Sequence, residues 1–96
     1  MLNIYPEIYE KLAILLEEKI EGKSFFSDRI TFEDSATDYL FTATLMIYYT
    51  ECRYPEGYEN IIIDIVPVWW EFHSTEQDGE KLNDFDFELL KEVICN

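Results

Sequence analysis

The stretch that decides the fold runs from Asp38 to His73 and reads DYLFTATLMIYYTECRYPEGYENIIIDIVPVWWEFH. Its middle, Arg53–Gly57, holds a proline and a glycine, which is typical of a tight turn. The segments on both sides are rich in β-branched and aromatic residues, which favour strands. We therefore predict an antiparallel hairpin of two long strands, at about residues 38–52 and 59–73.

Alternate residues of the first strand differ in character, and its odd positions are all apolar: Tyr39, Phe41, Ala43, Leu45, Ile47 and Tyr49. Alternate side chains share one face of a sheet, so we expect this face to meet the core. Pairing odd positions with odd positions continues the face through Ile61, Ile63 and Trp69, whereas a slip by one residue would bury Asp64. Pro67 lacks an N–H group and predicts an edge, a bulge or a bend at its position.

Segments outside the hairpin predict a helix at each end of the chain. A proline opens the helical pattern at residues 6–21, and its apolar stripe is Ile8, Leu12, Leu15, Leu16 and Ile20. A strand at 29–33 and a turn at 34–37 follow, and Asp78-Gly79 marks either a second hairpin or a loop. The last helix has Asn83, Asp84 or Asp86 as its cap, Phe85 or Phe87 at its entry, and the stripe Leu89, Leu90, Val93 and Ile94. We predict one α+β domain over residues 1–96, with the order α-β-β-β-α and an antiparallel sheet of three or more strands flanked by the two helices.

The composition is acidic but not that of a disordered tail. The chain of 96 residues carries a net charge of −14, while 48% of it is hydrophobic and 17% aromatic. Such a surface repels phosphate backbones and anionic lipid, so we expect no direct nucleic-acid binding and no membrane binding. A protein partner, either a second copy or a basic protein surface, fits the charge better, although acidity that only maintains solubility explains it too.

The sequence offers no metal or cofactor site. Two cysteines and one histidine give no zinc-ligand spacing, and the three glycines stand singly, so a phosphate-binding loop is absent. An EF-hand loop centred on Gly79 would need carboxylates at Ser74 and Phe85. The segment Met1–Glu7 lacks the basic and apolar regions of a signal peptide, so we expect a cytoplasmic protein with Cys52 and Cys95 reduced.

Catalysis has one candidate residue. His73 is the only histidine, and Glu71 lies two residues earlier on the same strand face. A small hydrolase or accessory enzyme subunit could use this pair, and Cys52 is the only thiol we considered as its nucleophile. No nucleophile elbow or oxyanion-hole turn supports this hypothesis, so we predict no catalytic residue and a chain that is not an enzyme.

Two surfaces are candidates for protein interaction. The even face of the hairpin is too apolar for an ordinary solvent surface, so it is either covered by a helix or used as an interface, for which we predict Met46, Tyr48, Val68 and Trp70. The turn near Asp78 adds an acidic contact with Glu76, Asp78 and Glu80. Our leading hypothesis is a non-enzymatic interaction module. A variant of it is an inhibitor that mimics nucleic acid through the acids between Glu71 and Glu92, since carboxylates on a strand or helix repeat at roughly the spacing of phosphates.

Overall fold

The computed structural model describes residues 1–95, and its elements follow the predicted order with one more strand. The helices are α1 (Pro6–Ile20) and α2 (Phe87–Cys95). The strands are β1 (Phe25–Asp34), β2 (Thr37–Tyr54), β3 (Gly57–Glu76) and β4 (Gly79–Lys81). They form one antiparallel sheet in the order β1-β2-β3-β4, so the predicted α+β fold with terminal helices is confirmed.

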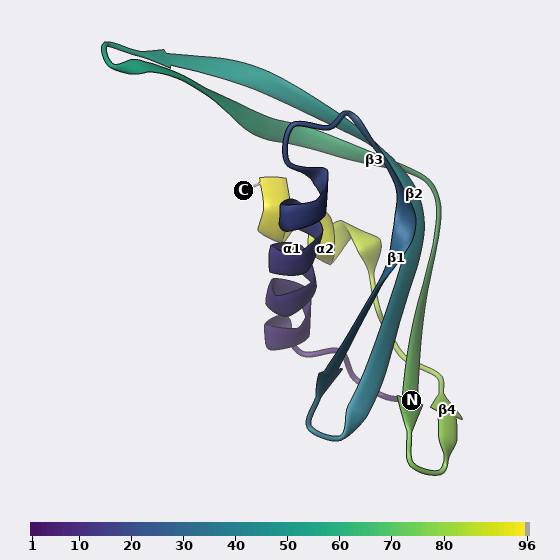
Figure 1. Ribbon diagram of the computed structural model, residues 1–96. Coiled ribbons are helices and arrows are strands. Elements are labelled where there is room, and N and C mark those ends of the chain that lie inside the picture. The colour runs from purple at the N-terminus through teal and green to yellow at the C-terminus, as the bar shows by residue number, and fades with distance from the viewer. Residues whose placement is uncertain (96) are drawn as a thin grey trace.

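Both helices lie on the same side of the curved sheet (Figure 1). On this inner face, the odd residues of β2 from Tyr39 to Ile47 are buried against α1 and α2, as their alternation predicted. Leu12, Leu16 and Leu90 are fully enclosed between the helices and the sheet. The opposite, outer face carries no helix of the described chain, so the alternative in which a helix covers this face is wrong (Figure 1).

The predicted odd-with-odd register holds only in the middle of the β2–β3 hairpin. Ile47 pairs with Ile65 there, but bulges at Thr44/Leu45 and Tyr48/Tyr49 shift the register on both sides, so that Phe41 pairs with Phe72. Each bulge adds one residue to β3 and exchanges the faces beyond it. The prediction that Ile61, Ile63 and Trp69 continue the core is therefore wrong, and these side chains are exposed. The first bulge adjoins Pro67, as its missing N–H predicted.

The far end of the hairpin extends from the body as a two-stranded arm, residues 48–64 (Figure 1). β1 begins opposite Met46, and β4 pairs only with residues 74–76, so neither strand accompanies the arm. The molecule measures 54 × 24 × 18 Å as a result. The hydroxyl of Tyr49 lies 2.8 Å from the carbonyl oxygen of Ile20 and 2.7 Å from that of Lys23, which ties the base of the arm to the end of α1.

The turns and caps follow local chemistry with one exception. Asp86 caps α2, because its carboxylate accepts the N–H of Glu88 at 2.9 Å. Glu76 pairs with Gly79, so the Asp78-Gly79 signal marks a second hairpin rather than a loop. The exception is the β1–β2 turn, where Ser35 and Ala36 adopt φ values of 50° and 65°, a region that favours glycine or asparagine.

No helix within residues 1–95 is long and apolar enough to cross a bilayer.

Candidate protein-interaction surfaces

The outer face is built from rows of residues that lie side by side across β1, β2 and β3. Directly paired residues point to the same face of a sheet. The pairing therefore defines five rows of the outer face: Phe25–Met46–Val66, Ser27–Thr44–Trp69, Arg29–Thr42–Glu71, Thr31–Leu40–His73 and Glu33–Asp38–Thr75. The first two rows form an apolar and hydroxyl-bearing region with no charged side chain.

The charged side chains of the outer face lie mainly in two rows, with Arg29 and Glu71 in the third row and the acids Glu33 and Asp38 in the fifth. Arg29 and Glu71 occupy opposite ends of one row, on either side of Thr42. The Arg29 guanidinium forms no ion pair with any residue from 1 to 95. The first three rows together are therefore neutral, and the acids Glu33 and Asp38 lie at the end of the outer face that carries the β1–β2 turn.

The structure places the predicted apolar interface residues on two different faces. Met46, Tyr48 and Val68 are exposed, and Val68 is the extra residue of the first bulge. Trp70, by contrast, pairs with Ala43 on the inner face, and its ring lies 5.3 Å from that of Phe85. Its predicted place on the outer face is therefore wrong. The bulge gives that place to Trp69, which is 46% exposed.

A groove of about 970 Å³ lies between the C-terminal half of α1 and the inner side of the arm. Its floor and walls include two exposed apolar side chains, Ile14 of α1 and Tyr58 of β3. Its acidic lining consists of Glu17, Glu18, Glu21 and Glu59, and none of these four carboxylates forms an ion pair within residues 1–95. Lys23 is the one cation among the lining residues.

The end of α1 adds to the negative potential of this groove. The carbonyl end of a helix carries a partial negative charge, which disfavours nearby carboxylates. Glu17, Glu18 and Glu21 nevertheless gather there. The sequence reasoning missed this groove, although acids at a helix C-terminus are a signal that was readable from the sequence. Its other wall comes from residues 49–62 and could not be placed from the sequence alone.

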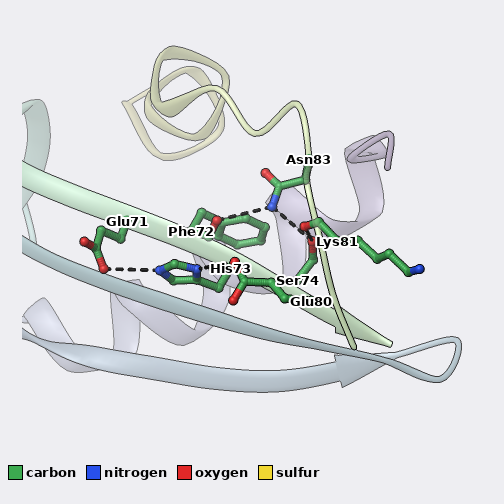
Figure 2. A network of polar contacts seen from close by, with 7 residues as sticks. All are labelled: Glu71, Phe72, His73, Ser74, Glu80, Lys81 and Asn83. Atoms are coloured by element: carbon green, nitrogen blue, oxygen red, sulfur yellow. Dashed lines mark hydrogen bonds and ion pairs between the residues drawn. The ribbon is translucent and has the colours of Figure 1, made fainter. Parts of the chain in front are cut away.

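The outer edge of β3 holds His73 between two carboxylates (Figure 2). Nε2 lies 3.2 Å from Glu71 and Nδ1 lies 3.2 Å from Glu80. Hydrogen bonds to these two groups raise the pKa of His73 above its ordinary value. Both ring nitrogens are thus engaged, and Cys52 lies twelve residues along β2 from Leu40, the partner of His73, which is about 40 Å of strand. The Cys52–His73 pair that we considered is not assembled.

The inner side of the same strand carries a buried polar network (Figure 2). The Asn83 amide donates to the Phe72 carbonyl at 3.2 Å and to the Ser74 hydroxyl at 3.0 Å. The Ser74 hydroxyl donates to the Lys81 carbonyl at 2.8 Å. The Asn83 side-chain oxygen accepts the N–H of Phe85 at 3.0 Å. This network fastens the segment that leads into α2 to the end of β3.

The predicted acidic contact around the β3–β4 turn is partly engaged in internal pairs. Asp78 lies 2.8 Å from the Lys81 ammonium group, which lowers the pKa of the Asp78 carboxyl. Glu80 contacts His73, and Glu76 accepts the Thr37 hydroxyl at 3.2 Å. All three predicted residues lie together at this turn, but they present fewer free charges than the sequence suggests.

The remaining groups that could react or bind a metal are the two cysteines and the acidic side chains. Cys52 and Cys95 are free thiols, and burial raises the pKa of Cys95. The described residues contain no cluster of His, Cys, Asp or Glu suited to hold a metal ion.

Comparison with known protein families, with characterised proteins and with solved structures gives no match for this chain. The function therefore has to be inferred from the surfaces described above.

Proposed function

We propose that this protein is a non-enzymatic interaction module that binds a basic protein segment. The observation that carries the proposal is the groove between α1 and the arm. It combines four carboxylates without ion-pair partners in residues 1–95 with the exposed side chains of Ile14 and Tyr58.

Charge and apolar contact have separate roles in such a site. The carboxylates and the negative end of α1 attract and orient lysine or arginine side chains, and this attraction weakens as salt rises. Ile14 and Tyr58 supply the apolar contact, which holds a bound segment after encounter. The expected ligand is therefore a lysine- or arginine-bearing segment with at least one apolar side chain.

The two alternative functions have less support. Mimicry of nucleic acid needs an extended line of free carboxylates, but Glu71, Asp78 and Glu80 are engaged with His73 and Lys81. Hydrolysis needs a nucleophile that His73 can activate, and both nitrogens of this histidine face carboxylates instead.

The test uses an amphipathic peptide of lysine and leucine as the probe. A peptide of lysine and serine is the control, because it keeps the positive charge but lacks apolar side chains. Binding is measured by calorimetry at low and physiological salt for the whole chain and three variants. The groove variant combines Glu17→Gln, Glu18→Gln and Glu21→Gln. A matched variant removes three exposed acids elsewhere by Glu7→Gln, Glu33→Gln and Asp38→Asn. The third variant reverses the turn acids Glu76, Asp78 and Glu80 to lysine.

We expect the wild type to bind the leucine-bearing peptide more tightly than the serine-bearing one. The groove variant should lose at least about tenfold in affinity, and the matched variant should lose less than about threefold. Equal losses in both would show that only total charge matters, and the groove would be rejected as the site. A loss confined to the turn variant would place the contact at Glu76, Asp78 and Glu80.

A further inference from the structure

We infer that the outer face is the contact between two copies of this chain, related by a two-fold axis parallel to β2. This inference does not depend on the proposed function, because it concerns the opposite side of the sheet. It commits to a second copy because the residues across the first three rows of this face are complementary to their own two-fold image.

The pairing register provides the geometric argument. A two-fold axis along β2, lying between two stacked sheets, keeps each residue at its position along the strands and exchanges β1 with β3. Each row of the outer face then lies over the same row of the other copy in reverse order. Sheets that stack in this aligned manner are about 10 Å apart.

Side-chain sizes match under this operation. Phe25 faces Val66 of the second copy, and Met46 faces its own equivalent at the axis. Trp69 faces Ser27, which places a large side chain over a small one. The exposed fractions of Phe25 and Trp69, 52% and 46%, show that apolar area is available for this contact.

The charges of the third row also match, whereas Asp38 in the fifth row faces its own equivalent, so the contact rests on the first four rows. Arg29 and Glu71 end the same row, so the two-fold operation sets Arg29 of each copy against Glu71 of the other. Both side chains are long enough to meet across about 10 Å. Glu71 contacts His73 through one carboxylate oxygen, Oε2, and its second oxygen can accept from the guanidinium. A dimer contains two such pairs, and they select this orientation over others.

The size of the outer face sets the expected strength. Three strands spaced about 4.8 Å apart and four rows spaced about 6.7 Å apart cover about 400 Å² on each copy. The total of about 800 Å² is below the roughly 1,200 Å² at which standard specific interfaces begin, and the charge of −14 on each copy opposes association. We therefore expect a weak dimer, with a dissociation constant in the range of about 10 to 300 μM at physiological salt.

The experiment is sedimentation equilibrium of the whole chain up to about 500 μM, with charges reversed in the row that contains Arg29 and Glu71. The variants are Arg29→Glu and Glu71→Arg, each alone, together in one chain, and as an equimolar mixture of the two single variants. Arg53→Glu and Glu56→Arg on the arm repeat the same charge changes away from the outer face. Thermal melts of every variant check that it is folded.

Each single reversal should weaken self-association at least about tenfold, because it sets like charges against each other twice. The double variant and the mixture of the two single variants should both restore it, since each recovers two opposite-charge contacts. The arm controls should associate as the wild type does. A wild type that stays monomeric, a dimer unaffected by the single reversals, or a mixture that fails to associate would each overturn the inference.

Discussion

Replacing Asn83 by alanine should destabilise the fold more than its partly exposed position suggests. The side chain makes hydrogen bonds to Phe72, Ser74 and Phe85, at 3.2, 3.0 and 3.0 Å. A net contribution of about 1 kcal/mol for each bond gives a loss of about 3 kcal/mol in the free energy of unfolding. For a domain of this size the loss lowers the melting temperature by about 12 to 24 °C.

Urea denaturation followed by tryptophan fluorescence measures this loss, since Trp70 packs on Phe85 and Phe87 just beyond Asn83. Asn60→Ala is the matched control, because Asn60 is exposed on the arm, and it should change the free energy of unfolding by less than about 0.5 kcal/mol. A double-mutant cycle with Ser74→Ala should give a coupling energy of about 1 kcal/mol. If Asn83→Ala costs no more than the control, or if the two changes are additive, the network does not fasten α2 to the sheet.

Three further predictions test the turn, the histidine and the surface charge. Replacing Ser35 by asparagine and Ala36 by glycine should raise the free energy of unfolding by about 1 kcal/mol, because both residues have positive φ and are strained. A lower urea midpoint for this variant would show that the native turn is not strained. The stability that His73 gains from Glu71 and Glu80 should be fully present below its unfolded pKa of about 6.5 and should be lost as pH rises through its raised folded pKa. Urea midpoints of wild type and His73→Gln should therefore converge from about pH 6 to about pH 9. A difference that is constant across this range would show that the positive charge of His73 does not stabilise the fold. Raising sodium chloride to about 0.5 M should increase the melting temperature by screening the net charge of −14, whereas a flat response in a melting series would mean that the acids are already well separated.

The sequence alone determined the elements and the core side of β2. The apolar stripe of α1 and the strict alternation of β2 are local patterns, with periods that match a helix and a strand, and the structure confirms both. The capping of α2 by Asp86 and the turn at Gly79 also follow from chemistry within a few residues. Met46 and Tyr48 are exposed on the even side of β2, as the same alternation predicted.

Only the tertiary structure decided how these elements use their faces. Trp69 and Trp70 are adjacent and equally apolar, so the pattern could not tell which one faces the helices. The bulge beside Pro67 turns Trp70 to the inner face, where its ring packs on Phe85 and Phe87. The placement of both helices on one face, which leaves the outer face uncovered, depends on packing between distant segments. The groove depends on it too, because its two walls, α1 and the arm, meet where the Tyr49 hydroxyl reaches the carbonyl of Ile20, which lies 29 residues earlier in the chain. Periodicity records which side of an element is apolar, but the free energy that selects its neighbour comes from contacts between segments far apart in the sequence.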